Sequence, residues 1–229
     1  MLKKIVFFNV SERDKFVIEF SKSIPYGSKV LDAGAGSCPY RVNFSHCEYL
    51  TQDFIQLDDE QLRYGNGYGK IDIISDITSI PLDDETFDVI ICTEVFEHIP
   101  RPDLALREFS RLLKKGGKLL ITAPLMSGLH QEPYHFYGGF TPYWYKYFFE
   151  KYAINAINLM PNRDFFFLLA QENLRAIKIL KNKVSLIFLI LFSPLVLIYL
   201  LTSMISFIFG LIIQDYSFTV GYHVIGQKN

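Results

Sequence analysis

The sequence predicts a doubly wound α/β fold built on a mostly parallel sheet. Strand-like and helix-like segments alternate along most of the 229 residues, an order typical of βαβ units. The strand-like segments are rich in Val, Ile, Leu and Phe with little alternation of polar residues, as expected for strands covered on both faces. A glycine-rich turn follows the first of these strands, at the position where such folds bind ligands.

The elements are expected in the following order. Ser11 and Thr141 have the chemistry of N-caps, and their helices are expected to end near residues 23 and 152. A third helix is expected over 103–115, with Gly116-Gly117 as its stop. The seven expected strands lie near 29–33, 48–53, 70–75, 86–92, 118–123, 154–160 and 218–226.

Composition limits the classes of function. The formal net charge is −1, so the chain lacks the electrostatic footprint of a nucleic-acid-binding protein. The three cysteines, none in a CxxC pair, indicate neither a metal site nor a disulfide framework. No signal peptide is expected, which favours a reducing, cytoplasmic compartment. We therefore expect one domain over residues 1–229, with no nucleic-acid partner and no metal.

A glycine turn and an acidic residue on the next strand predict a nucleoside-cofactor site. Asp32 and the turn Gly34-Ala35-Gly36 fall at the end of the first strand. Glycine tolerates positive φ and has no side chain, so a ligand can lie against backbone amides there. Asp53 ends the second strand, where a carboxylate can accept hydrogen bonds from a ribose diol. A Gly-x-Gly alone is weak evidence, and the two features together carry the prediction.

Further motifs follow in a fixed order along the chain. They are Ile80-Pro81-Leu82, Phe87-Asp88-Val89-Ile90, Glu97-His98 and Gly116-Gly117-Lys118. From about residue 29 to 124 this series resembles the class I S-adenosylmethionine-dependent methyltransferases, although Cys38-Pro39 stands where a third glycine is frequent. The resemblance implies a Rossmann-like, seven-stranded sheet with the last strand antiparallel, S-adenosyl-L-methionine as cofactor, and methyl-transfer activity.

The resemblance also implies roles for individual residues. Asp32 would lie near the methionine amino group, Asp53 on the ribose and Asp76 with Ile77 on the adenine. His98 would lie on the cofactor side of the sheet, where it would either hold the start of a helix or act in catalysis. The expected cofactor-binding residues are Asp32, Gly34, Ala35, Gly36, Asp53, Asp76, Ile77, Thr93, Glu94 and His98.

The loop over residues 129–140 is expected to cover the methyl acceptor. It follows the fifth strand and contains two histidines, a carboxylate and four aromatic residues. Histidine is suited to move a proton near neutral pH, so His130 or His135 is a candidate general base. A lid that only packs is the alternative. The irregular spacing of His130, Glu132 and His135 is a weak pattern for metal ligands.

A long apolar segment precedes the last strand. Residues 184–213 carry no charge over 30 positions, more than the ~18 that make a candidate membrane helix. Pro194 would divide the segment into arms 184–193 and 194–213, which favours a hairpin preceded by an amphipathic helix over 163–183. The basic residues of that helix are Arg175, Lys178, Lys181 and Lys183. A single membrane span and a buried helix pair in a core or dimer interface are the alternatives.

These observations together predict a methyltransferase with a helical, membrane-associating insertion over residues 161–215. Lipid contact through 163–213 would anchor the chain to the cytoplasmic face of a membrane. The acceptor would be small or lipid-linked. The alternative is a catalytically silent protein that keeps the cofactor fold and serves as a membrane-anchored binding or scaffold module.

Overall fold

The computed structural model describes residues 8–65, 67–185 and 191–229. The chain forms two compact units. The sheet unit comprises Arg13–Met160 and Gly221–Asn229, and the hairpin unit comprises Met1–Glu12 and Pro161–Val220. The insertion expected over 161–215 lies within the hairpin unit.

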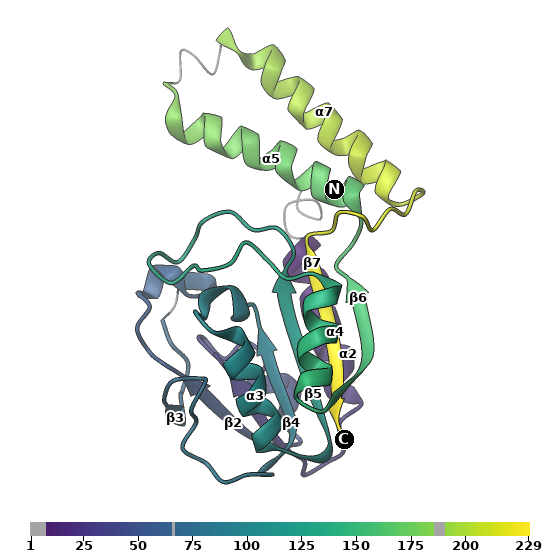
Figure 1. The fold of residues 1–229 in the computed structure, drawn as a ribbon. Helices are drawn as coiled ribbons and strands as arrows, with labels where there is room; N and C mark the ends of the chain where they lie inside the picture. The colour runs from purple at the N-terminus through teal and green to yellow at the C-terminus, as the bar shows by residue number, and fades with distance from the viewer. Residues whose placement is uncertain (1–7, 66, 186–190) are drawn as a thin grey trace. The chain divides into compact units, whose positions relative to one another are not determined.

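The sheet has seven strands in the order β3-β2-β1-β4-β5-β7-β6 (Figure 1). Strand β1 pairs in parallel with β2 on one side and with β4 on the other, so the direction of winding reverses between β1 and β4. Strand β7 pairs with β5 antiparallel, which confirms the predicted sheet. The strands are β1 Lys29–Ala33, β2 Glu48–Asp53, β3 Ile73–Ile74, β4 Phe87–Thr93, β5 Leu113–Pro124, β6 Ile154–Pro161 and β7 Gly221–Lys228.

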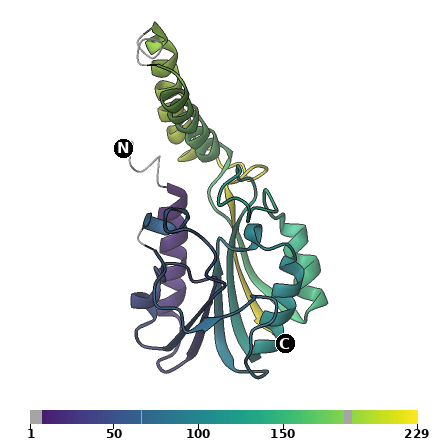
Figure 2. The same cartoon turned by 90° about the vertical axis from the view of Figure 1, so that its left-hand side faces the viewer.

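Helices cover both faces of the sheet, which explains why its strands lack polar alternation. Figure 2 shows α2 (Phe8–Lys22) on one face, with α3 (Pro102–Leu112) and α4 (Pro142–Lys151) on the other. Successive side chains of a strand point to opposite faces. Accordingly, Val30 packs in the cluster that contains the α2 residues Val17 and Phe20, whereas Leu31 packs in the cluster that contains Phe109 and Tyr145.

Two of the expected helix ends are wrong. Helix α2 begins at Phe8, so Ser11 lies inside the helix and is not its cap. Helix α3 ends at Leu112 and β5 begins at the next residue, because Leu113 is buried in the sheet core. Gly116-Gly117 therefore belongs to β5, where the pairing with β4 shifts register between Phe87 and Val89. The Thr141 cap is confirmed, since its side chain accepts a hydrogen bond from the amide of Trp144.

Strand positions also differ in detail from those expected. β3 is confined to Ile73–Ile74 within the expected 70–75, and β7 begins at Gly221 and not at 218. The shift of β7 follows the pairing, because Gly221 is opposite Pro124 at the end of β5.

The hairpin unit contains two long helices, α5 (Phe165–Lys183) and α7 (Ser193–Gly210), which lie side by side (Figure 1). Asp164 caps α5 by accepting hydrogen bonds from the amides of Phe166 and Phe167 at 2.8 and 3.2 Å. Pro194 lies in the first turn of α7, where no backbone donor is required. Pro194 therefore starts a helix instead of kinking one. The expected first arm, over 184–193, falls partly on residues 186–190, which lie outside the described residues.

The polarity of α7 is the reverse of that of a helix in a water-soluble core. Its buried residues are the small residues Ser203, Ser206 and Gly210. The Ser203 hydroxyl donates to the carbonyl of Ala170 at 2.8 Å, and a Cβ on Gly210 would lie 2.5 Å from the ring of Phe167. Among the described residues, α7 is the one helix that is long and apolar enough to cross a membrane. Its half-exposed side chains include Leu197, Ile198, Leu201, Ile205 and Ile208.

We expect Gly210→Val to separate the end of α7 from α5, because the new side chain would occupy the space of the Phe167 ring. Overpacking of this kind costs about 1–3 kcal/mol. Limited proteolysis in detergent should therefore cut the variant faster than the parent chain. Leu211→Val is the control, since Leu211 is 62% exposed; equal cleavage of both variants would contradict the assigned packing.

Candidate functional site

The turn after β1 can be formed only by glycine at its first position. Gly34 has φ +72°, and a Cβ there would lie 2.5 Å from a methyl group of Val95. The amides of Gly34 and Ala35 donate to the carbonyl of Gln52 at 2.9 and 3.0 Å. The turn is thus fixed to the end of β2, and its backbone can approach a ligand closely.

Asp53 joins the glycine turn to β2 from the other side. One carboxylate oxygen accepts a hydrogen bond from the Gly36 amide at 2.8 Å, and the other accepts from the Ile55 amide at 3.1 Å. The side chain is buried, and burial raises the pKa of Asp53 while these amide hydrogen bonds oppose the rise. Each oxygen has a second acceptor site, which leaves capacity for a ligand hydroxyl.

A cavity of about 770 Å³ opens in the sheet unit at the carboxyl ends of β1 and β4. This is the point where the winding of the sheet reverses, and ligands of doubly wound folds bind there. Nine of the ten residues expected to bind the cofactor line its wall: Gly34, Ala35, Gly36, Asp53, Asp76, Ile77, Thr93, Glu94 and His98. His130, the candidate base from the loop, also lines it.

Two expected site residues are not among those that line the cavity. Asp32 is 1% exposed, and its carboxylate accepts a hydrogen bond from the Tyr49 hydroxyl. Burial, together with the charge of Asp53, raises the pKa of Asp32 to about 7. His135 lies behind His130, with ring centroids 4.7 Å apart, and one ring nitrogen is 3.1 Å from the Ser127 hydroxyl.

Sequence reasoning did not identify Arg13, which forms an ion pair in the cavity wall. Its guanidinium is 3.2 Å from a carboxylate oxygen of Glu94, whose second oxygen accepts from the Thr122 hydroxyl at 2.9 Å. Glu94 has φ +55°, a conformation that is strained for a residue other than glycine. Arg13 is in α2, and nothing in the local pattern distinguishes it from the solvent-facing charges of that helix.

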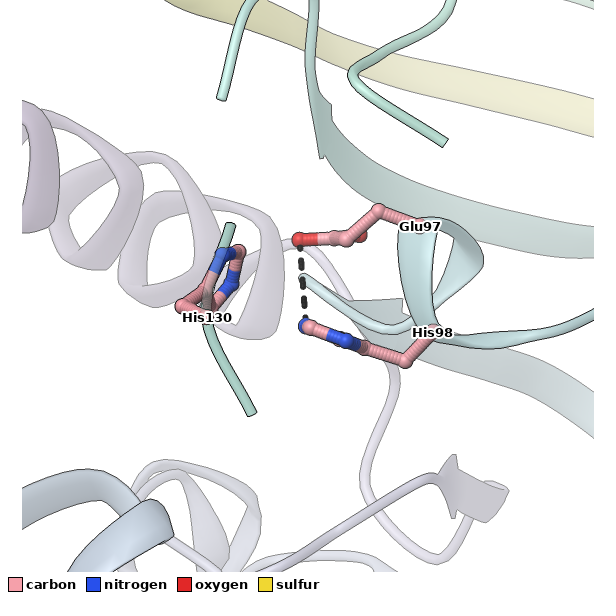
Figure 3. A group of neighbouring side chains, drawn as sticks. All are labelled: Glu97, His98 and His130. Carbon is pink, nitrogen blue, oxygen red and sulfur yellow. Dashed lines mark ion pairs between the residues drawn. The ribbon is translucent and has the colours of Figure 1, made fainter. Parts of the chain in front are cut away.

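Three further polar side chains of the cavity wall lie close together (Figure 3). Glu97 and His98 come from a single 3₁₀ turn, η4 (Phe96–His98), and His130 comes from the loop after β5. Their potential ligand atoms all lie within 4.8 Å of one another. Burial raises the pKa of Glu97 well above its ordinary value, and the charge of Glu94 adds to that effect. Burial also lowers the pKa of His98 to about 4.

Comparison with known proteins agrees with this geometry. A family profile described as a methyltransferase domain matches residues 31–121, which contain the glycine turn, Asp53 and the Glu97-His98 pair. The match and the seven-stranded sheet make residues 31–121 similar to S-adenosylmethionine-dependent methyltransferase domains. S-adenosylmethionine is the cofactor that this match and the residues lining the cavity support.

Curated relatives of the methyltransferase domain differ in what they act on. Sarcosine/dimethylglycine N-methyltransferase of Halorhodospira halochloris is 29% identical over 115 residues, covering 47% of this chain and 41% of the relative. Ubiquinone/menaquinone biosynthesis C-methyltransferase UbiE of Pasteurella multocida is 29% identical over 136 residues, covering 54% and 50%. The chain spans about half or less of the length of these relatives.

A solved structure shows the same fold. Coclaurine N-methyltransferase, in complex with N-methylheliamine and S-adenosylhomocysteine, superposes with a TM-score of 0.56 at 17% identity. The match covers 96% of this chain and 70% of that one. At such identity the match establishes the fold, and the contents of the site have to be argued from this chain's own residues.

We expect Asp53→Ala to weaken binding of S-adenosylhomocysteine by about 5- to 150-fold, measured by calorimetry. The variant would leave ribose hydroxyls without an acceptor in the cavity, a loss of about 1–3 kcal/mol. Asp83→Ala, in an exposed turn, is the control. Unchanged affinity in a folded Asp53→Ala variant would remove Asp53 from the site.

We also expect the stability of the chain to depend on the protonation of Asp32. Because folding raises the pKa of this carboxyl to about 7, its contribution is complete below the unfolded pKa of about 3.9 and is lost as the pH rises through about 7. Relative to Asp32→Asn, the parent chain should lose up to about 1.4 kcal/mol per pH unit over this interval.

Denaturant unfolding in detergent, between about pH 5 and pH 8, measures the difference. Tyr49→Phe is the matched variant: the Tyr49 hydrogen bond lowers the pKa of Asp32, so its removal should extend the loss to higher pH. The same pH dependence in the parent chain and Asp32→Asn would contradict the assignment.

Proposed function

We propose that this chain transfers a methyl group from S-adenosylmethionine to an acceptor held between the cofactor and the loop over 129–140. The proposal rests on one observation: the residues expected to bind the cofactor and the residues of this loop line the same cavity. Residues of the cofactor half end at Glu94 and His98, and His130, Gln131, Tyr134 and Phe136 of the loop continue the same wall.

The cavity has room for two ligands. Its volume of about 770 Å³ lies in the upper part of the range of about 300–1,000 Å³ for small-molecule sites. The loop is fixed at this end, because the amides of Phe136 and Tyr137 donate to the carbonyl of Glu97 at 2.8 and 3.2 Å. It can therefore cover a bound acceptor and exclude water, which would otherwise compete with it.

Methyl transfer makes few demands on side chains. The acceptor attacks the methyl carbon in line with the sulfur, and the bond between carbon and sulfur breaks with its electron pair left on sulfur. Alignment supplies most of the acceleration. An oxygen acceptor must also lose its proton, and His130 is the histidine of the loop that lines the cavity.

We propose further that the hairpin unit holds the chain at a membrane, where a small or lipid-linked acceptor is found. Supporting this, α7 buries small residues and exposes apolar ones, as expected where the surroundings are hydrocarbon. The basic residues of α5, among them Lys181 and Lys183 in its last turn, suit anionic headgroups. β6 and β7 are neighbours in the sheet, so the segment between them leaves and rejoins one sheet, which favours a hairpin over a single span.

The catalytic proposal is tested with the full chain in detergent, S-adenosylmethionine and a membrane lipid extract. We expect formation of S-adenosylhomocysteine above the level without extract, and loss of that increment in Asp53→Ala. Tight binding of S-adenosylhomocysteine with no turnover on lipid or soluble extracts would identify a silent binding module instead.

The membrane proposal is tested with Leu201→Gln/Ile205→Gln, which changes two half-exposed residues of α7. In the proposal these two side chains are buried in lipid, and replacing them with Gln loses about 3–6 kcal/mol of membrane-binding free energy. Binding to vesicles in high salt should therefore fall by roughly 100-fold or more. Tyr143→Gln/Tyr147→Gln changes exposed aromatic residues of α4 in the sheet unit and serves as the control. A parent chain recovered without detergent as a stable dimer would contradict the proposal.

A further inference from the structure

We propose that Glu97, His98 and His130 bind a divalent transition-metal ion, of which zinc is the best match, and that this ion holds an oxygen of the methyl acceptor. The inference rests on the proposed function, because all three side chains line the cavity of the methyltransferase domain. The expectation of no metal came from the isolated cysteines and from the irregular spacing of His130, Glu132 and His135. The fold replaces two of these three residues with the adjacent pair Glu97-His98.

The distances suit an ion shared between the side chains better than direct hydrogen bonds. Nε2 of His98 is 3.7 Å from Oε1 of Glu97, whereas a hydrogen bond would place them at about 2.7–3.2 Å. Two ligands at ~2.1 Å from a tetrahedral zinc are ~3.4 Å apart. Figure 3 shows the polar ends of the three side chains facing one another. A small movement of His130 would bring its ring nitrogen to ligand distance from an ion bound by Glu97 and His98.

Backbone hydrogen bonds fix both imidazoles in the form that binds a metal. Nδ1 of His98 lies against the carbonyl of Tyr134, and Nδ1 of His130 is 2.9 Å from the carbonyl of Gly128. A carbonyl only accepts, so Nδ1 carries the hydrogen in each ring and Nε2 is left with its lone pair. Metal-binding histidines are oriented in this way in proteins, with the second nitrogen donating to a carbonyl or a carboxylate.

The side chain of Glu97 has an oxygen without a hydrogen-bond partner among the described residues. Glu97 is 1% exposed, and the oxygen without a partner is Oε2. The nearby Arg13 forms its ion pair with Glu94. A buried polar atom without a partner is costly, and an ion bound by Glu97, His98 and His130 would supply a partner for this oxygen.

Two imidazoles and one carboxylate are the ligands of known catalytic zinc sites, which keep one position open. Because the three side chains line the cavity, an open position on the cavity side would hold the acceptor, and the inferred acceptor class is an oxygen nucleophile such as a hydroxyl. The ion would lower the pKa of that hydroxyl and its proton would pass to solvent, so in such a transfer His130 would hold the ion and would not be the base. The oxygen then bonds to the methyl carbon, the carbon–sulfur bond breaks toward sulfur, and the products are a methyl ether, S-adenosylhomocysteine and a proton.

Cobalt(II) is the probe, because its bound form absorbs visible light. The full chain in detergent, stripped with a chelator, should bind one Co²⁺ with the intensity of a four-coordinate site, and Zn²⁺ should displace it. His98→Ala and His130→Ala should each weaken Co²⁺ binding by roughly 100-fold or more. Glu97→Gln, which keeps the shape of the side chain, should do the same.

His46→Ala is the matched control. The His46 ring contacts the carbonyl of Ile24 and is not among the residues that line the cavity, so Co²⁺ affinity should stay within about twofold. Equal loss in His46→Ala and His130→Ala would show scattered surface binding and overturn the site.

Calorimetry with S-adenosylhomocysteine on the same samples separates the two proposals. A chain that binds S-adenosylhomocysteine but not Co²⁺ overturns the metal site and leaves the methyltransferase proposal intact. A chain that binds Co²⁺ but not S-adenosylhomocysteine overturns the proposed function, and with it the role of the ion in methyl transfer.

Discussion

The hydrogen bond from the Gly36 amide to the Asp53 carboxylate is the contact on which the candidate site depends. It joins the turn after β1 to the end of β2 at 2.8 Å and directs the remaining lone pairs of Asp53 toward the cavity. The turn can approach this closely because Gly34 fits beneath Val95 without a side chain. A ligand held there meets backbone amides on one side and a carboxylate on the other, an arrangement suited to a nucleoside with a free diol.

The second half of the cavity is organised by acidic residues with different partners. Glu94 is held in a strained conformation by Arg13 and Thr122, so its charge is compensated within the chain. Glu97 has two histidines beside it, and its Oε2 accepts no hydrogen bond from the described residues. The sulfonium of the cofactor is also positive and could approach Glu97, but a sulfonium does not coordinate imidazole lone pairs. The fixed Nδ1–H tautomers of His98 and His130 therefore favour an ion that accepts nitrogen ligands.

The sheet and most of the cofactor half could be predicted from the sequence because they follow from local patterns. Strands that are apolar throughout indicate that both faces of the sheet are covered. The glycines at the end of β1 indicate a tight turn that a ligand can approach. Arg13 and Glu97 could not be found this way. Arg13 acquires its role only through packing against a residue 81 positions later, and Glu97 becomes a site residue because the loop carrying His130 folds over it. Asp32 is a different case: its position next to the glycine turn predicts ligand contact, whereas in the structure its carboxylate accepts a hydrogen bond from Tyr49 and Asp32 is not among the residues that line the cavity.

The apolar segment shows how the structure reduces the possibilities that composition leaves open. Composition alone allows a span, a hairpin or a buried interface, since each requires a long uncharged sequence. The placement of Ser203, Ser206 and Gly210 on the buried side of α7 leaves the large apolar side chains of this helix exposed, so the helix is not buried in this chain's own core and its outer face would meet lipid or a second apolar surface. Retention of β7 in the sheet beside β5 adds a second constraint, since the segment must begin and end at neighbouring strands. The two constraints together favour a hairpin that is held together by small residues inside, in keeping with the proposal that its apolar outer surface meets lipid.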